Sequence, residues 1–295
     1  MQADAPVGIL GLGLIGTAFS ERLVGADIPV IGFDIDPGRC AKLRGNRGTV
    51  AASARELADH CRAIVIAVYS GAEAEAAFAD LENNPARPVI ICTTTCAPNE
   101  IIRLARRAAS AGIPFVEAPI SGTSAEVRDG TATALVAGDA AAIDAVDGLL
   151  DILCPQRTRI GKVGDASRAK LAINLILQNN RAALAEGIVL AERMGLDGQT
   201  FLATARQSAA YSRVMDTKGE KMLNRHFRPQ SRLSQTLKDA ELILAEAARQ
   251  GLRLPVTEAQ ADLLRTAIAI AGPGSDSAAI IEAIRQQPDS TKVSQ

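Results

Sequence analysis

The first half of the chain alternates short apolar runs, rich in Val and Ile, with longer stretches of helical character. Buried parallel strands produce such runs, and crossover helices separate them. The pattern therefore predicts a doubly wound parallel sheet. The predicted strands are 7–10, 30–33, 63–68, 89–92, 115–117 and 133–136, and the predicted helices are 14–24, 37–43, 54–60, 97–110 and 140–150.

After Gly164 the pattern becomes helical. Asp165 can cap a helix that continues without Pro or Gly to Glu186 and extends on to Met194. Residues 171–177 (LAINLIL) are apolar on nearly every face, which predicts a central helix that is buried all round. A later helix is expected over 233–250, and the tail after Pro288 is expected to be frayed. This change of pattern divides the chain into domains 1–163 and 164–295.

Composition supports a folded chain that acts on small molecules. The 295 residues are 47% hydrophobic and 22% charged, which excludes a disordered protein and suits two domains. Lys and Arg number 32 against 33 Asp and Glu, so no global charge attracts nucleic acid or a membrane surface. The long uncharged stretch 5–20 contains four glycines and is too short to span a bilayer. The residues before it lack the basic character of a secretory signal, so we expect a cytoplasmic protein.

The five cysteines show no paired spacing and are expected to be reduced and buried. A metal site would depend on the dipeptide His60-Cys61, since the only other histidine is His226. We predict no metal.

Cofactor chemistry is indicated by a glycine motif between the first strand and the first helix. Gly11, Gly13 and Gly16 form G-x-G-x-x-G: the first permits the turn, the second admits a pyrophosphate and the third lets helix and strand pack. Asp34 ends the second strand, where a carboxylate can bind both ribose hydroxyls, and it would repel a 2′-phosphate together with Asp36. These features predict an N-terminal Rossmann domain that binds NAD, and Arg39 keeps NADP open. The assigned cofactor residues also include Leu12, Leu14 and Ile15 of the turn and Val68 at the end of the third strand.

Three further segments accompany the glycine motif: EAPISGTSAEVRDGT at 117–131, GKVGDASRAKLAIN at 161–174 and LKDAEL at 237–242. Together they resemble the β-hydroxyacid dehydrogenase family, which includes 3-hydroxyisobutyrate dehydrogenase and is related to 6-phosphogluconate dehydrogenase. The second half is most similar to the tartronate semialdehyde reductases of that family. The resemblance implies an all-helical second domain that binds substrate. We also expect a homodimer or homotetramer, because a helix as apolar as LAINLIL and the alanine-rich segments after it need more cover than a small helical domain provides.

The resemblance also implies roles for single residues. It makes Lys170 the catalytic acid and base, with Asn174 one helical turn on to orient the substrate. It assigns substrate binding to Ser121, Gly122 and Thr123. Without it, that segment reads as an ordinary turn between two strands, and Lys170 as a solvated residue of a first helical turn.

The remaining assignments rest on shorter matches. Lys238 and Thr95 match cofactor-binding positions of the family, and Arg213 can pair with a second substrate carboxylate. Lys238 can also pair with a carboxylate on an exposed face of its helix, such as Glu241, three residues on, or Glu246.

Departures from the family pattern affect the substrate site. Thr123 replaces a glycine, Glu126 a small uncharged residue and Ile173 a polar one, while Ala166 stands where glycine is frequent.

These features predict an NAD-preferring oxidoreductase that interconverts a small β-hydroxy acid and its aldehyde or keto acid. The tartronate semialdehyde and 3-hydroxyisobutyrate types of substrate are both open. Two alternatives stay open as well: an imine reductase, which usually lacks the lysine found here at Lys170, and a non-catalytic NAD(H)-binding regulator.

Overall fold

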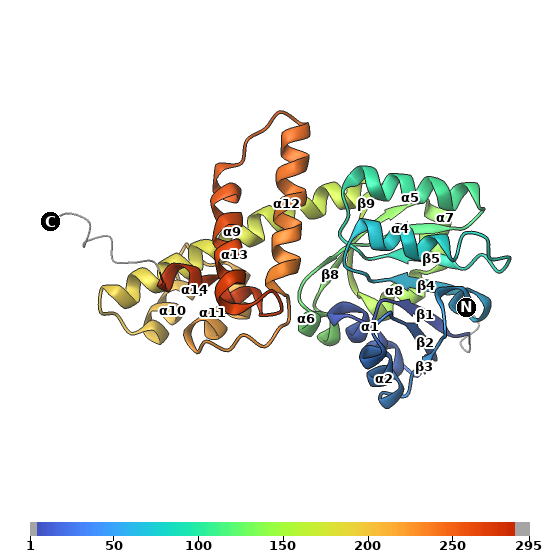
Figure 1. The fold of residues 1–295 in the computed structure, drawn as a ribbon, viewed down its shortest axis with the longest axis horizontal. Coiled ribbons are helices and arrows are strands. Elements are labelled where there is room, and N and C mark those ends of the chain that lie inside the picture. Colours follow the sequence, from blue (N-terminus) through green and yellow to red (C-terminus); the bar gives the residue numbers. More distant parts are fainter. Residues whose placement is uncertain (1–4, 287–295) are drawn as a thin grey trace. The chain divides into compact units, whose positions relative to one another are not determined.

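The computed structural model describes residues 5–286, and the predicted frayed tail after Pro288 lies outside them. The chain divides into two compact units, Met1–Lys170 and Leu171–Gln295. Figure 1 shows strands and helices in the first unit and only helices in the second. This confirms the predicted order of an α/β domain followed by a helical domain that begins with a long helix.

The first unit is built on a nine-stranded sheet. The parallel strands follow the order β3-β2-β1-β4-β5-β6, which is that of a Rossmann domain. Next to β6, β8 runs antiparallel and pairs with both β7 and β9. The strands are β1 (Val7–Leu10), β2 (Val30–Phe33), β3 (Thr49–Val50), β4 (Ala63–Ile66), β5 (Val89–Cys92), β6 (Phe115–Glu117), β7 (Ile120–Ser121), β8 (Thr133–Gly138) and β9 (Gln156–Gly161).

The two central strands show why apolar runs in the sequence predicted strands correctly. Every residue of β1 and β4 is buried, as parallel strands covered on both faces require. They pair in register from Val7 opposite Ala63 to Leu10 opposite Ile66. Their carboxyl ends therefore lie side by side, at the point where the strand order reverses and doubly wound sheets bind ligands.

Helices connect these strands. They are α1 (Leu14–Gly25), α2 (Pro37–Gly45), α3 (Ala54–His60), α4 (Gly71–Ala79), α5 (Pro98–Ser110), α6 (Ser124–Asp129), α7 (Ala140–Ala145) and α8 (Asp147–Leu153). Helix α5 is amphipathic, because Ile101, Leu104 and Ala108 recur at helical spacing and are buried.

Several boundaries differ from the prediction. The predicted strand 63–68 ends at Ile66, and the predicted helix 140–150 is two helices, because Val146 has a non-helical backbone (φ −117°, ψ 9°). The two-residue strands β3 and β7, the six-residue strand β9 and the helices α4 and α6 were not predicted. In α4 only Gly71, Ala74 and Phe78 are buried, too few for a clear apolar period.

The second unit contains only helices among its described residues. The long helix α9 (Asp165–Arg193) begins in the first unit and agrees with the predicted central helix. Its residues Leu184 and Ile188 pack in one core with Leu202, Leu264 and Ile281 of later helices. Those later helices are α10 (Gly198–Arg206), α11 (Arg213–Leu223), α12 (Leu233–Arg249), α13 (Pro255–Ala271), the short η1 (Ser277–Ala279) and α14 (Ile280–Arg285).

The prediction that residues 171–177 are buried on every face was wrong. Leu171 and Asn174 are buried, but Ile173 is 37% and Ile176 59% exposed. The helix packs along one face only, and an apolar sequence does not by itself supply a cover for the opposite face. Association into dimers or tetramers, which could cover it, stays a prediction.

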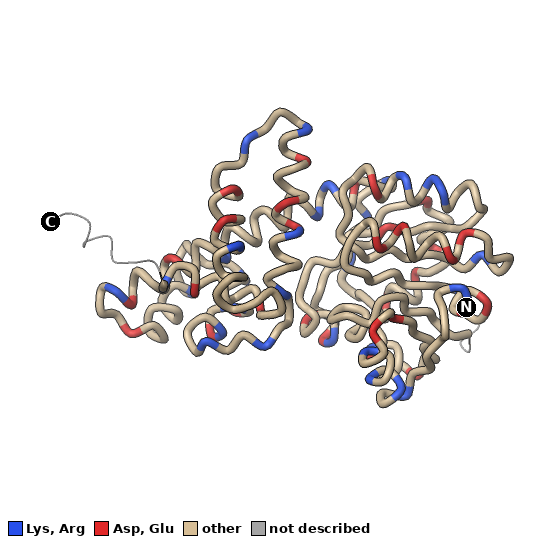
Figure 2. Tube along the Cα trace, viewed as in Figure 1, with Lys and Arg blue, Asp and Glu red and all other residues tan. Residues whose placement is uncertain are grey.

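Charge and polarity agree with the composition. Figure 2 shows acidic and basic positions interspersed in each unit, without a large region of one sign. Within residues 5–286, none of the helices is long and apolar enough to cross a membrane. All five cysteines are free and buried, as predicted.

The third motif glycine provides a test of the packing. A Cβ at Gly16 would lie 1.8 Å from the carbonyl oxygen of Gly11, so we expect Gly16→Ala to cost about 3 kcal/mol or more. Thermal unfolding should show a fall in Tm of roughly 5–10 °C. Gly25 ends the same helix and a Cβ there meets nothing within 4 Å, so Gly25→Ala is the matched control and should be neutral or slightly stabilising. Equal Tm values for both variants would contradict this packing role.

Candidate active site

The glycine motif forms a tight turn at the carboxyl end of β1. Gly11 has φ +94°, which disfavours any other residue, and its N–H donates to the Phe33 carbonyl at 2.9 Å. A Cβ on Gly11 would lie 2.6 Å from the Ala67 oxygen and 3.0 Å from Val68 Cγ1. The turn, the end of β2 and the end of β4 are therefore packed together.

The second glycine leaves the start of α1 open. A Cβ on Gly13 would meet nothing within 4 Å, and Gly13, Leu14 and Ile15 are half-buried. Gly13 is also the N-cap and has no side chain to accept from the first turn. The first N–H groups of a helix have no intrahelical acceptors and carry a positive partial charge. A pyrophosphate fits this position, with its oxygens on the α1 N–H groups.

Asp34 lies buried beside this turn. Its Oδ2 accepts from the Leu12 N–H at 2.7 Å and its Oδ1 from the Asp36 N–H at 2.8 Å. Arg39 Nη1 lies 3.2 Å from Oδ2 and Arg39 Nε lies 3.4 Å from Asp36. These contacts hold the carboxylate at the end of β2, where a dinucleotide places its adenosine ribose. They also pair the Arg39 guanidinium with two acids.

A threonine that the sequence did not single out joins the ends of β4 and β5. Thr94 Oγ1 accepts from the Val68 N–H and donates to the Val68 carbonyl, both at 3.2 Å. The predicted residue, Thr95, is adjacent and half-buried. The signal was the run of three threonines that follows β5, in which spacing cannot distinguish one hydroxyl from the next.

The predicted substrate segment begins at the end of β7. Ser121 is half-buried and Gly122 has φ +151°. Thr123 caps α6: its hydroxyl accepts from the Glu126 N–H at 3.3 Å, and its N–H donates to Glu126 Oε2 at 2.7 Å. Thr123 and Glu126, two of the departures from the family pattern, therefore form one capping box. The Thr123 N–H is directed to a carboxylate of the chain itself.

Glu117, at the end of β6, holds the start of α9. Its Oε2 accepts from the Gly164 N–H at 2.6 Å, and its Oε1 accepts from the Ser167 N–H at 2.6 Å and the Ser167 hydroxyl at 2.5 Å. Burial raises the pKa of the Glu117 carboxyl above its usual range, while the three donors oppose that rise. Asp165 was predicted to cap this helix. That prediction was wrong, because the cap comes from β6 and Asp165 is the first helical residue.

Lys170 and Asn174 lie one turn apart on α9, and each is only 4% exposed. Asn174 Nδ2 donates to Asp239 Oδ2 at 3.0 Å, and Lys238 Nζ lies 2.9 Å from Asp239 Oδ1. Asp239 thus joins α9 to the predicted lysine of α12.

Arg213 is the first residue of α11 and is exposed, unlike Lys170 and Asn174. The structure thus brings the cofactor candidates of β1, β2 and β4 together, and separately joins Asn174 to Lys238. Within the described residues, no group of three His, Cys, Asp or Glu side chains could hold a metal ion. Cys61, of the dipeptide considered above, is buried, and this burial raises the pKa of its thiol to about 12.

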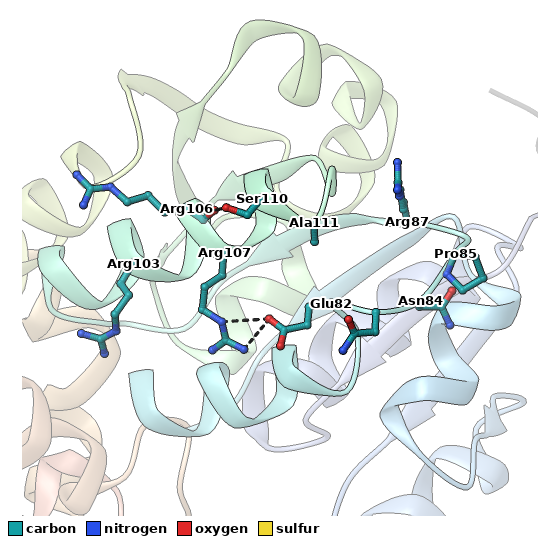
Figure 3. A pocket seen from close by; sticks show the side chains of 10 residues that line it. Glu82, Asn84, Pro85, Arg87, Arg103, Arg106, Arg107, Ser110 and Ala111 are labelled. Carbon is teal, nitrogen blue, oxygen red and sulfur yellow. Dashed lines mark hydrogen bonds and ion pairs between the residues drawn. The ribbon is translucent and has the colours of Figure 1, made fainter.

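A cavity of about 750 Å³ lies elsewhere in the first unit. Residues 82–87, which precede β5, and the second half of α5 line it, so it is at the amino end of β5. Figure 3 shows Arg107 turned toward Glu82 there, while Arg87 and Arg106 point away from that pair. Rossmann domains bind dinucleotides at the opposite, carboxyl edge of the sheet. We therefore assign the cofactor to the glycine turn and not to this cavity.

Comparison with known proteins agrees with this geometry. Residues 6–161 match the NAD-binding domain of 6-phosphogluconate dehydrogenase, and residues 164–284 match the NAD-binding family of NADP-dependent 3-hydroxyisobutyrate dehydrogenase. The chain is 28% identical to 2-hydroxy-3-oxopropionate reductase of Escherichia coli, over 94% of this chain and 96% of that protein. It is 27% identical to glyoxylate/succinic semialdehyde reductase 1 of Arabidopsis thaliana, over 95% and 98%.

The fold also matches a solved structure. A 3-hydroxyisobutyrate dehydrogenase from Salmonella typhimurium superposes with a TM-score of 0.86 at 24% identity, covering 95% of this chain and 99% of that one. Fold and site therefore define an NAD(P)-dependent oxidoreductase. The chain belongs to the β-hydroxyacid dehydrogenase family, in the group similar to 3-hydroxyisobutyrate dehydrogenase.

The Glu117 contacts can be tested by replacing its carboxyl group with an amide. Glu117→Gln would turn an amide N–H₂ toward a backbone donor, so we expect a loss of about 2 kcal/mol of unfolding free energy. Ser167→Ala removes only one of the three donors and should cost about 1 kcal/mol. Urea denaturation of the two variants measures both. A Glu117→Gln variant as stable as the wild type would show that the helix start does not need the carboxylate.

Proposed function

We propose that this protein is an NAD-preferring dehydrogenase that interconverts a small β-hydroxy acid and its semialdehyde or keto acid. The observation that carries the proposal is the buried pair Lys170 and Asn174 on one face of α9, with the Asn174 amide held by Asp239. A lysine is seldom buried without a chemical or structural reason. The relatives named above reduce 2-hydroxy-3-oxopropionate and glyoxylate or succinic semialdehyde, which supports this class of substrate.

Lys170 manages the proton. In oxidation its Nζ accepts the proton of the substrate hydroxyl, and in reduction it returns a proton to the oxygen. Asn174 carries no titrating charge, so it orients the same oxygen and leaves the transfer to the lysine. The nicotinamide cofactor supplies or accepts the hydride when bound.

The substrate carboxylate is assigned to the segment 121–123. The Ser121 hydroxyl can donate to a planar anion, and Gly122, at φ +151°, has no side chain to block the anion's approach to the backbone. Thr123 contributes differently, because its N–H and hydroxyl are both bonded to Glu126. We therefore assign Thr123 to shaping this segment and Ser121 and Gly122 to binding.

Cofactor choice is assigned to Asp34. The Leu12 and Asp36 N–H groups orient its carboxylate at the place of the adenosine ribose. A 2′-phosphate would meet that charge, and Arg39, which could bind the phosphate, is already paired with Asp34 and Asp36. These contacts support NAD over NADP.

Asp34→Ser should narrow the preference for NAD. The serine keeps one hydroxyl for the ribose but removes the charge and frees Arg39, so kcat/KM with NADP⁺ should rise at least about tenfold relative to NAD⁺. Steady-state kinetics with both cofactors measures this ratio. The assignment fails where the wild-type enzyme already prefers NADP⁺, and Arg39→Ala would then identify the phosphate-binding residue.

Lys170→Ala should lower kcat by about 10²–10⁴, the usual contribution of a positioned acid and base. NADH affinity, measured by fluorescence titration, should hardly change, since the glycine turn and Asp34 bind the cofactor. Lys170→Arg should rescue little, because a guanidinium does not exchange its proton near neutral pH.

Arg168 provides the matched control, since it lies on the same helix and is paired with Asp165 in an exposed position. Arg168→Ala should keep wild-type kcat. The substrate panel should include glyoxylate, succinic semialdehyde and 2-hydroxy-3-oxopropionate. A Lys170→Ala variant with wild-type kcat on the best of them would overturn the proposed mechanism.

A further inference from the structure

The buried face of α9 stays polar well beyond Lys170 and Asn174. Gln178 and Arg181 follow at spacings of four and three residues, so all four side chains lie along one face of the helix. They are 4%, 4%, 2% and 4% exposed in chain order. From Ala182 on, the buried residues of this helix are apolar, among them Leu184, Ala185 and Ile188. The polar stripe therefore ends at Arg181.

Arg181 is a buried cation with unused donors. Its Nε and Nη1 are inaccessible to solvent and have no hydrogen-bond partner among the described residues. Burial lowers the pKa of its guanidinium to about 10, against the attraction of Asp276 and Asp239. A buried charge without a bonded partner is strongly unfavourable. The buried Arg181 guanidinium therefore lowers the stability of the protein, and a ligand that accepts its hydrogen bonds can offset this loss.

The two carboxylates that attract Arg181 are already paired. Asp276 accepts from Lys218 at 2.7 Å and from three backbone N–H groups, and Lys221 lies 3.4 Å away. Asp239 is held by Lys238 and Asn174. Three lysines therefore pair with these two carboxylates, and Arg181 adds a further positive charge.

Other buried amides of this unit also lack partners. Gln178 Oε1 and both amide atoms of Gln260 are inaccessible and have no partner within residues 5–286. Gln260 lies one turn after Thr257 on α13, and Asn179 Nδ2 of α9 donates to Thr257 Oγ1 at 3.2 Å. Several polar groups on α9 and α13 thus lack partners, although buried polar groups in folded proteins nearly always have them.

We propose that Arg181 binds a second carboxylate of the substrate, and that the substrate is a dicarboxylic β-hydroxy acid. The inference rests on the proposed function, because it takes Asn174 as the group that meets the reacting oxygen. A carboxylate would accept from the guanidinium in charge-assisted hydrogen bonds and neutralise the additional charge.

Helix geometry sets the distance between Asn174 and Arg181. Arg181 follows Asn174 by seven residues, or roughly 10 Å along the axis at about 1.5 Å per residue. Two hydrogen bonds of about 3 Å take up part of that span. A substrate that carries a second carboxylate a few bonds beyond its reacting oxygen can therefore contact both residues.

The sequence offered Arg213 for the second carboxylate, and the structure favours Arg181. Arg213 is exposed at the start of α11. An exposed arginine is well hydrated and adds little on binding an anion, whereas a buried one has already lost its water. Substitution of Arg181 should therefore weaken the binding of a second carboxylate, and substitution of Arg213 should not.

Binding can be measured without the cofactor. Calorimetric titration of the wild-type protein with glutarate and with pentanoate compares acids that differ by one carboxylate. We expect glutarate to bind at least about tenfold more tightly, and Arg181→Met to abolish the difference. Arg213→Met is the matched control and should retain it.

Turnover gives the second readout. The substrates are 2-(hydroxymethyl)glutarate and 2-(hydroxymethyl)pentanoate, which share the reacting group and chain length. Arg181→Met should raise KM for the diacid by about 10²-fold and leave kcat and the monoacid kinetics unchanged. Removal of an unpaired buried charge should not lower Tm, so a folding defect is not expected. Should Arg181→Met fail to fold, Arg181→Gln serves in its place.

The outcomes separate the two proposals. Equal binding of glutarate and pentanoate by the wild-type protein, or retained selectivity in the Arg181 variant, overturns the second carboxylate site. The proposed function then still stands if the monoacid or the relatives' substrates are turned over. Glutarate selectivity that depends on Arg181, without turnover of any hydroxy acid, would support the site and contradict the proposed function.

Discussion

The start of α9 depends on one buried carboxylate. Glu117 accepts three hydrogen bonds from Gly164 and Ser167, and so connects strand β6 of the sheet to the helix that carries Lys170. A helix begins with unpaired N–H groups, and a charged acceptor fixed in a strand determines where that beginning lies. Lys170 is one turn beyond Ser167, so its position along the helix follows from the position of Glu117.

A second carboxylate has a similar role in the helical unit. Asp239 accepts from the Asn174 amide and pairs with Lys238, so one acid orients two residues that the family resemblance had assigned separately. Both acids are buried and hydrogen-bonded, as polar groups inside a protein nearly always are. The candidate catalytic residues are thus supported from elements distant in sequence and need no flexible loop to hold them.

Local motifs were predictable because spacing defines them. Gly11, Gly13, Gly16 and Asp34 follow one strand, one turn and the next strand, and the structure packs that turn between the ends of β2 and β4. Family membership, the Rossmann domain and the long helix were likewise predicted.

Contacts between distant segments were not predictable. Glu117 lies 47 residues from Gly164, and Asn174 lies 65 residues from Asp239. The sequence around Glu117 or Asn174 contains no signal that identifies its distant partner. Thr94 could not be separated from Thr95 for a different reason, because adjacent hydroxyls differ only in the direction that the backbone gives them. The exposure of Ile176 shows that apolar character indicates a preference for burial without ensuring that a neighbour is present.

The continuity of α9 limits how the chain can be divided. The boundary between the two compact units falls between Lys170 and Leu171, inside an unbroken run of helix. A fragment that ends at Lys170 would keep only a stub of this helix, too short to be stable alone, with its last carbonyl groups unpaired. The complementary fragment would begin without the capping carboxylate of Glu117. Separate expression of the two units therefore requires a division of the chain before Gly164 or after Arg193. Helix α9 then stays intact and belongs to only one of the two fragments.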